Sequence, residues 1–324
     1  MGKPFGFGTW AHRVYDFGAN PEAVDTNVKR LTDAGFSLIV VSVKNPPGYA
    51  DFVTDVAHVN PAYPGWDPLK VLAESAERHG AQVHAWMCVF PEGKHSALLE
   101  KKPQLAAVLE GKPRIHWSCA CHPEVQEYEL ALYRSVADRY PVHGLHLDYI
   151  RTGEHCRCDY CREQMAARGL DVMTLTGKDP AYAEWVNWRC DRVTAFVEQI
   201  RRLTRQKGIA LSAAVSAQII SWLFSNAQDW ARWVETGLLD FLFPMDYDNF
   251  TRRVALKICQ NLALVGGKCA VWDGLGKKSG NSELTTEALI EQIRTVKGAG
   301  AQGAVIFNYK ALTDEDLAAI RSLA

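Results

Sequence analysis

Asp148 is the side chain in this sequence whose type and position best suit chemistry. It stands near the C-terminal end of a short strand expected over residues 143–150, where apolar and polar residues alternate. A carboxylate at such a place costs stability when it is buried, unless it is paired or takes part in a reaction. The simpler alternative is a structural ion pair with Arg151, which follows three residues later.

A cluster of cysteines follows this strand directly. Three thiols fall within six residues, at Cys156, Cys158 and Cys161. Tetrahedral zinc needs a fourth ligand, which we expect from Cys119 or Cys121, in an excursion over residues 91–122 beside the loop after Asp148. A closed site of four thiolates would hold a structural Zn²⁺. An iron–sulfur cluster and unligated thiols are the alternatives.

A second acid, Asp246, stands in the segment PMDYD at the end of a strand expected over residues 239–245. Two carboxylates that flank one bond are the usual machinery for cleaving a glycoside. We therefore predict Asp148 as nucleophile or stabiliser and Asp246 as general acid/base. Their carboxyl groups should lie about 5–5.5 Å apart for retention, or about 6.5–9.5 Å apart for inversion. The alternative for Asp246 is that it caps the next helix or holds a loop.

These acids need a scaffold that brings them together, and the chain alternates strands with helices throughout. The predicted strands cover residues 5–10, 36–43, 82–90, 143–150, 209–216, 239–245, 269–272 and 304–307. Helical patterns separate them, at residues 21–35, 67–79, 123–140, 158–168, 180–207, 226–236, 251–265, 285–299 and 313–323. Eight such units predict an α/β fold, a single (β/α)₈ TIM barrel domain over residues 1–324 with long loops at its C-terminal face. A doubly wound open sheet also alternates, but no glycine-rich phosphate loop follows the first strand.

The active site of such a barrel lies at the C-terminal ends of the strands. The side chains expected there are candidate substrate contacts: Trp10, His12, Lys44, His84, Trp86, His146, Arg151, Tyr247, Asp248, Trp272, Asp273, Asn308 and Lys310. Aromatic rings can stack on the C–H face of a sugar, and charged or amide groups can bind its hydroxyl groups. This rim therefore predicts a carbohydrate substrate.

Several of these candidates have simpler explanations. Asp273 precedes Gly274 and suits a turn. The three tryptophans can instead fill the core. The two histidines within strands, at positions 84 and 146, alternate with apolar neighbours, which favours hydrogen-bonded supporting roles over catalysis.

Composition argues against several classes of protein. A net charge of −1 gives no electrostatic attraction for nucleic acid or an anionic membrane, and no run approaches the ~18 apolar residues of a membrane span. The first residues, MGKPFGFGTWAHR, lack the apolar stretch of a secretory signal. We therefore expect a cytoplasmic protein, although a trimmed chain would read the same. The sequence has no nucleophile elbow, no HExxH and no paired histidines on the first strand, which argues against serine hydrolases and binuclear amidohydrolases. No organic cofactor is expected.

Three segments resemble the glycosyl hydrolase-like 10 group of glycoside hydrolases and its relatives. They are WDPLKVLAESAERHGAQVHAW (66–86), HPEVQEYELALYRSVADRYPVHGLHLDYIR (122–151) and WVETGLLDFLFPMDY (233–247). The resemblance spans most of the chain, and LDYIR and PMDY are its most specific parts. It implies a (β/α)₈ carbohydrate-active enzyme.

The segment CRCDYC, with a cysteine upstream, is similar to the structural zinc site of zinc-containing β-galactosidases. Their upstream cysteine precedes a proline by four positions, as Cys119 precedes Pro123 here. The resemblance therefore implies a Zn²⁺ site made of Cys119, Cys156, Cys158 and Cys161. The Asn-Glu pair that those enzymes carry after the fourth strand has no match here, so their activity is not implied.

Two mechanisms remain open on these resemblances. A barrel of the α-galactosidase type would use Asp148 as nucleophile and Asp246 as acid/base. Chitinase-like enzymes instead carry DGxDxDxE on the fourth strand and MxYD on the sixth, and the segment MDYD (245–248) fits the second motif. Ile150 stands where the catalytic Glu of the first motif would be. This departure weakens a substrate-assisted hydrolysis of N-acetylated sugars with Glu as acid, and it leaves Asp148 as the acid for that alternative. A barrel that only binds glycans, or a lyase or transferase, are the further possibilities.

Overall fold

The spacing of apolar residues along the chain accounts for the strands and helices of this protein. The computed structural model describes residues 4–323. Strand β2 (Phe36–Lys44) is apolar almost throughout, because both of its faces are buried. Helix α1 (Pro21–Asp33) buries only one face, and it begins where the Asn20 side chain accepts a hydrogen bond from the backbone N–H of Ala23.

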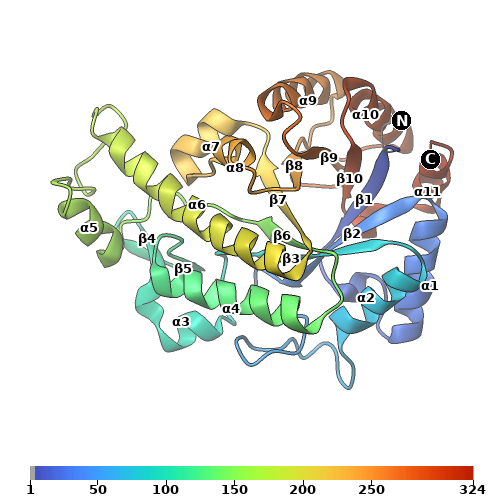
Figure 1. Ribbon diagram of the computed structural model, residues 1–324, viewed down its shortest axis with the longest axis horizontal. Helices are drawn as coiled ribbons and strands as arrows, with labels where there is room; N and C mark the ends of the chain where they lie inside the picture. Colours follow the sequence, from blue (N-terminus) through green and yellow to red (C-terminus); the bar gives the residue numbers. More distant parts are fainter. Residues whose placement is uncertain (1–3, 324) are drawn as a thin grey trace.

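Eight parallel strands close into a barrel, in the order β1, β2, β3, β6, β7, β8, β9 and β10, which returns to β1 (Figure 1). The strands are β1 (Gly6–Ala11), β2, β3 (Gln82–Cys88), β6 (Gly144–Asp148), β7 (Ala210–Ser216), β8 (Phe241–Met245), β9 (Ala270–Gly276) and β10 (Gly303–Phe307). Around them lie α1, α2 (Pro68–Arg78), α4 (Pro123–Arg139), α6 (Tyr182–Lys207), α8 (Trp230–Glu235), α9 (Thr251–Val265), α10 (Thr286–Ala299) and α11 (Asp314–Arg321). The predicted (β/α)₈ barrel is confirmed.

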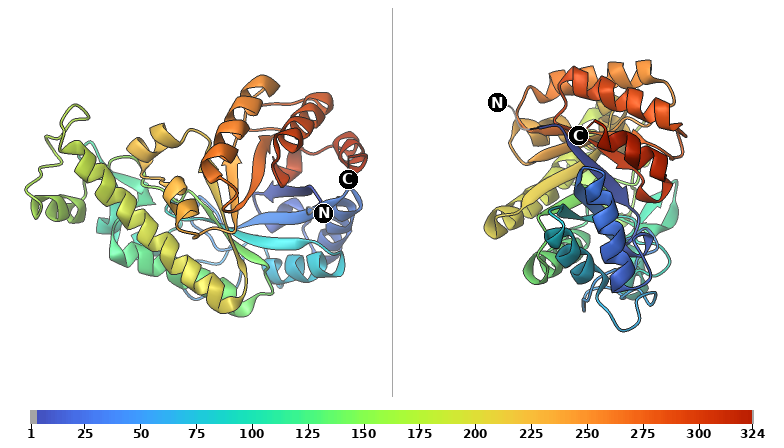
Figure 2. Two further views of the ribbon diagram at one scale, coloured as in Figure 1. Left: turned by 45° about the horizontal axis from the view of Figure 1, so that its top comes forward. Right: turned by 90° about the vertical axis from the view of Figure 1, so that its right-hand side faces the viewer.

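The segments after β3 and β6 form an extension to one side of the barrel. The predicted excursion over 91–122 contains a short helix and an antiparallel hairpin: α3 (Ala97–Lys101), β4 (Ala106–Leu109) and β5 (Lys112–Ser118). Helix α5 (Asp159–Ala166) and the first turns of α6 lie at the same end of the molecule (Figures 1 and 2). This extension carries the clustered cysteines.

Two short helices follow β7, where one helix over 226–236 was predicted. The first of them, α7 (Ile219–Asn226), precedes α8. The end of α7 is held by Arg189 of α6, whose guanidinium donates to the carbonyl groups of Phe224 (2.9 Å) and Ser225 (3.1 Å). Because the capping residue is distant in sequence, the residues of α7 and their neighbours do not by themselves indicate where the helix ends.

Strand β9 continues four residues beyond its predicted end at Trp272. The Trp272 ring therefore lies within the barrel and not at its rim. Gly6 and Gly303 leave space for it, since a Cβ atom at either position would lie 2.2 or 2.4 Å from the ring.

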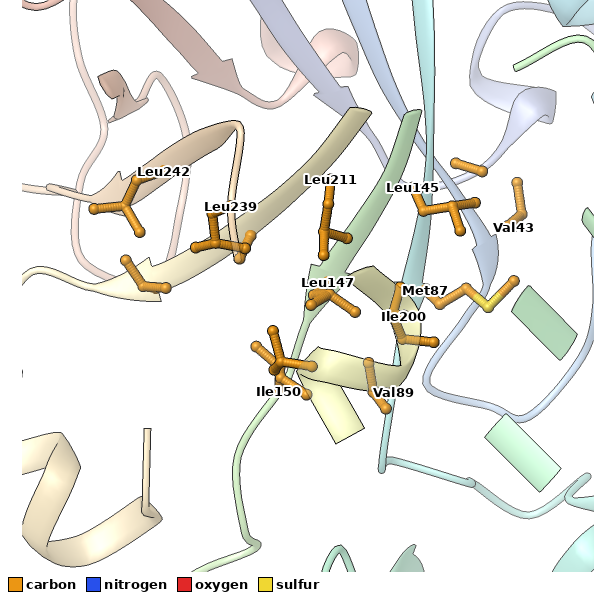
Figure 3. Close-up of a cluster of buried hydrophobic side chains, with 14 of the residues drawn as sticks. Val43, Met87, Val89, Leu145, Leu147, Ile150, Ile200, Leu211, Leu239 and Leu242 are labelled. Atoms are coloured by element: carbon orange, nitrogen blue, oxygen red, sulfur yellow. The ribbon is translucent and has the colours of Figure 1, made fainter. Parts of the chain in front are cut away.

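Two apolar layers hold the barrel together. The outer one lies between strands and helices, and Figure 3 shows part of it, including Leu147 of β6, Leu211 of β7 and Ile200 of α6. The inner one fills the barrel with large side chains such as Trp10 and Phe243. Within residues 4–323, none of the helices combines the length and apolar character needed to cross a membrane.

Candidate active site

The end of β6 holds Asp148 at the C-terminal mouth of the barrel, in register with Cys88 of β3. The residue is 7% exposed and lines a cavity of about 160 Å³. Its Oδ1 accepts a hydrogen bond from the backbone N–H of Tyr149 at 2.6 Å. Tyr149 has a φ angle of +51°, a left-handed conformation that is uncommon outside glycine. The backbone therefore turns sharply directly after the acid.

Aromatic side chains form most of the cavity wall. The lining consists of Trp10, His12, Ser42, Pro46, Trp86, Cys88, Asp148, Tyr149, Arg151, Ala214, Met245, Tyr247 and Phe307. The ring of Tyr247 stacks on Phe307 with centroids 5.2 Å apart, and His12 meets the same phenyl ring at 5.1 Å. Flat apolar walls of this kind suit the C–H face of a sugar ring.

Asp148 is the one carboxylate in this lining, as far as residues 4–323 are concerned. Burial raises the pKa of its carboxyl group, while the Arg151 guanidinium and the Tyr149 N–H act in the opposite direction. A carboxyl group with a raised pKa keeps its proton nearer to neutral pH, as a general acid requires. Burial also lowers the pKa of His12, which favours its neutral form.

The structure brings six of the predicted site residues together at this cavity: Trp10, His12, Trp86, Asp148, Arg151 and Tyr247. It also places residues there that the sequence analysis did not select: Ser42, Pro46, Cys88, Tyr149, Ala214, Met245 and Phe307. Strand alternation was the signal for some of them, because Met245 lies two residues before Tyr247 on the same face. No pattern in the sequence indicated the left-handed turn at Tyr149.

A hydrogen-bonded chain supports the cavity from below. The Trp10 indole N–H donates to Nε2 of His146 at 3.2 Å, so His146 carries its own proton on Nδ1. That proton faces Oγ of Ser212 at 2.8 Å, and the same hydroxyl lies 2.9 Å from Nδ1 of His84. Burial lowers the pKa of both histidines, that of His84 to about 3. Neither histidine is among the residues that line the cavity, and the contacts of both are with other side chains inside the barrel.

Asp246, the predicted partner of Asp148, is not among the residues that line the cavity. Its neighbours Met245 and Tyr247 line the cavity, so alternation turns Asp246 the other way, into the barrel wall. The carboxylate is fully buried, and its oxygens have no hydrogen-bond partner among residues 4–323 other than the adjacent carboxyl group of Asp273. Burial raises the pKa of Asp246 to about 7.

The residues predicted from β9 also lie away from the cavity. Trp272 packs inside the barrel, with its ring centroid 6.1 Å from that of Phe241 and 6.4 Å from that of Phe243. Asp273 points outward beside Asp246, and burial together with this second acid raises its pKa. Trp272 and Asp273 were predicted at the cavity because the strand was expected to end at Trp272, whereas β9 continues to Gly276.

Lys44 is likewise buried outside the cavity. Its ammonium group lies 2.5 Å from carboxylate oxygens of both Glu92 and Glu129, and all three side chains are inaccessible to solvent. A shift of register between Ser42 and Lys44 leaves the serine in the cavity lining and the lysine away from it. The lysine therefore anchors the loop after β3 to α4, away from the cavity lining.

The last three predicted contacts stand near the mouth but outside the lining. Asp248 pairs with Lys257 of α9 at 3.3 Å. The amide of Asn308 donates to the carbonyl group of Lys278 at 3.4 Å. Lys310 is exposed at the surface. The contacts of Asp248 and Asn308 thus stabilise the loops around the cavity.

The predicted convergence of the cysteines is confirmed. The sulfur atoms of Cys119, Cys156, Cys158 and Cys161 all lie within 4.8 Å of one another, and all four side chains are buried. Sγ of Cys119 is 3.6 Å from that of Cys161. A tetrahedral zinc with bonds of about 2.3 Å would separate its sulfur ligands by roughly 3.8 Å, so this set can hold a metal ion. Cys121 is buried nearby but is not in this group.

Residues 11–263 match the protein family described as glycosyl hydrolase-like 10. "Glycosyl hydrolase DigH" of Escherichia coli (strain K12) is 25% identical over 229 residues, which cover 59% of this chain and 48% of that protein. The chain therefore spans about half the length of the curated relatives it matches.

Solved structures share the barrel at low sequence identity. The PgaB (BpsB) glycoside hydrolase domain of Bordetella bronchiseptica superimposes with a TM-score of 0.79 at 15% identity, over 98% of each chain. The α-L-fucosidase isoenzyme 2 of Paenibacillus thiaminolyticus gives a TM-score of 0.70 at 18% identity, over 99% of this chain and 48% of that one. At such identities the likeness concerns the fold alone.

Proposed function

The chain belongs to the glycosyl hydrolase-like 10 family and is thus a glycoside hydrolase by family, and we propose that it cleaves a carbohydrate with Asp148 as its general acid. One observation carries the proposal: a buried carboxyl group with a raised pKa lies in an aromatic-lined cavity at the barrel mouth. Such a group can donate its proton to the glycosidic oxygen as the bond breaks.

The lack of a second acid in the lining favours a substrate-assisted mechanism. In that mechanism the acetamido oxygen of an N-acetylated sugar attacks the anomeric carbon, while Asp148 protonates the leaving oxygen. Water then opens the cyclic intermediate, returns a proton to Asp148, and leaves a product of retained configuration. The positions of Met245 and Tyr247 in the lining support this, since both belong to the chitinase-like segment MDYD. The substrate class we propose is therefore an N-acetylated glycan.

We also propose that Cys119, Cys156, Cys158 and Cys161 hold a structural Zn²⁺. Four thiolates leave no open position on the ion, so it would supply cross-linking and no catalysis. Cys119 follows β5, and the other three lie around the start of α5. The ion would thus tie the β4–β5 hairpin to the loop after Asp148.

A single barrel domain and a cytoplasmic location complete the proposal. None of the nine cysteines forms a disulfide bond in the structure, which suits a reducing compartment. Fractionation of cells that produce the full natural protein would test the location.

The function is tested by a screen of aryl glycosides and oligosaccharides in both anomeric series, with and without N-acetyl groups. We expect hydrolysis of N-acetylated substrates with retained configuration. Affinity for a glycan that is never cleaved would favour a binding protein, and unsaturated or transferred products would indicate a lyase or transferase. Efficient cleavage of sugars that have no acetamido group would refute the substrate-assisted mechanism.

A further inference from the structure

Arg151 is a buried cation that the protein leaves incompletely bound. It lines the cavity three residues after Asp148, and its side chain is 12% exposed. The guanidinium carbon lies 4.4 Å from the ring centroid of Tyr149 and 4.6 Å from that of Trp222 in α7. These two rings hold the group by cation–π contact, which takes up none of its N–H donors.

The N–H edge of Arg151 lacks an acceptor. Its Nη1 is buried and has no hydrogen-bond partner among residues 4–323. The carboxylate oxygen Oδ1 of Asp148 is 3.9 Å away, which is too far for a hydrogen bond. A buried donor without an acceptor destabilises the folded protein, and more so when it is charged. A fixed, desolvated guanidinium at the wall of a binding cavity is therefore organised for a ligand atom.

We propose that Arg151 binds an anionic group, a carboxylate or a sulfate, on the sugar that occupies this cavity, so that the enzyme acts on acidic glycans. The planar guanidinium matches the two oxygens of such a group, and charge-assisted hydrogen bonds of this kind are about twice as strong as neutral ones. The inference rests on the proposed function in one respect: it assumes that the cavity receives a sugar.

The charges of the cavity agree with this assignment. When Asp148 holds its proton, Arg151 carries the one full charge of the lining, because the pKa of His12 is lowered by burial. A bound anion would offset that charge and would keep the proton on Asp148, since a nearby negative charge disfavours ionisation of a carboxyl group. Binding of an acidic sugar and readiness for proton donation would therefore support each other.

The test measures binding, so it does not depend on hydrolysis. Wild-type protein, Arg151→Gln and Arg151→Lys are titrated by calorimetry with methyl β-D-glucuronide and with N-acetylglucosamine 6-sulfate. The neutral counterparts are methyl β-D-glucoside and N-acetylglucosamine. The matched control is Arg114→Gln, because this arginine lies over Trp117 near the mouth but outside the lining.

We expect the wild type and Arg114→Gln to bind at least one anionic sugar ten or more times tighter than its neutral counterpart. Arg151→Gln should lose that preference, and Arg151→Lys should keep only part of it, because lysine lacks the planar fork. The two anionic probes distinguish carboxylate from sulfate recognition. Equal binding of anionic and neutral sugars by the wild type would overturn the inference, and so would a preference that survives in Arg151→Gln.

Failure of this inference differs from failure of the proposed function. If the glycan screen finds hydrolysis of neutral glycans and the titrations find no anion preference, the function stands and the role of Arg151 is refuted. If the anion preference is found but no glycan is cleaved, Arg151 is a specificity residue of a binding protein. If Arg151→Gln does not fold, the wild type and Arg151→Lys decide the matter.

Discussion

At the scale of single residues, one step along a strand separates a position that lines the cavity from one in the barrel wall. Asp148 and Asp246 both stand at the ends of barrel strands, yet only Asp148 lines the cavity. Side chains alternate between the two faces of a strand. The inward positions at the end of β8 are Met245 and Tyr247, so the acid between them faces the barrel wall. The residue type indicated which side chains could take part in a reaction. The position of each residue along its strand determines whether its side chain faces the cavity or the barrel wall.

We predict that Asp246→Asn will reduce the dependence of stability on pH. The pKa of Asp246 is about 7 in the folded protein against a usual value of 3.8, so the folded state binds more protons than the unfolded state between these values. Its contribution to stability is complete below about pH 4 and is lost as the pH rises through about 7. The Tm of the wild type should therefore fall over this range more than that of the variant.

Scanning calorimetry at several pH values measures this difference. The matched control is Asp55→Asn, because the Asp55 side chain is 87% exposed. If Asp246→Asn and the wild type show the same slope of Tm against pH, the buried carboxyl group is not the source of the effect.

Ser212 is a second residue whose role is specific enough to test. Its hydroxyl group joins His84 to His146 within the barrel, and His146 in turn accepts from Trp10. Ser212→Ala leaves two buried ring nitrogens without partners, so we expect a loss of about 1–3 kcal/mol in the free energy of unfolding. Urea denaturation measures this loss. Removing the exposed hydroxyl of Ser322 is the control, and an equal, small effect of both changes would refute the supporting role.

At the scale of elements, the clustered cysteines come from two segments that lie outside the barrel sheet. The β4–β5 hairpin and the loop before α5 lie beside the barrel, and Cys119 joins the other three cysteines across them. The backbone N–H of Arg157 also donates to the carbonyl group of Val108 in the hairpin. The loop that leaves Asp148 is thus attached to this extension.

Loss of one thiol should therefore remove the metal and weaken the extension. We predict that Cys158→Ser will bind less than one equivalent of zinc and will lose several degrees of Tm, because the binding free energy of a structural zinc site contributes to folding. Elemental analysis and calorimetry measure the two effects. Cys259→Ser, an exposed thiol outside the cluster, should change neither. A variant with undiminished metal and Tm would argue against the site.

The elements themselves were predictable to different degrees. All eight barrel strands and most helices follow from local hydrophobic period and capping, as the Asn20 cap of α1 illustrates. Helix α7 did not follow, because its end is capped by Arg189 from a distant helix. The end of β9 was placed too early because Asp273 and Gly274 read as a turn, whereas the structure continues the strand through them.

At the scale of the whole molecule, the closed barrel explains why residues far apart in sequence meet at one cavity. Trp10 from β1, Asp148 from β6 and Phe307 from β10 converge because the C-terminal ends of parallel strands share one mouth. Sequence reasoning could identify that mouth and its main acid. It could not identify which neighbours face inward once strand ends shift, as the register shift before Lys44 shows.

If Asp148 acts at this mouth without Asp246, the variants Asp148→Asn and Asp246→Asn should differ in kcat/KM on the best substrate from the glycan screen. We predict that Asp148→Asn loses about 10²–10⁴-fold, the usual contribution of a general acid, with its Tm preserved. Asp246→Asn should keep activity of the same order as the wild type. An active Asp148→Asn, or an equal loss of activity in Asp246→Asn, would contradict the account.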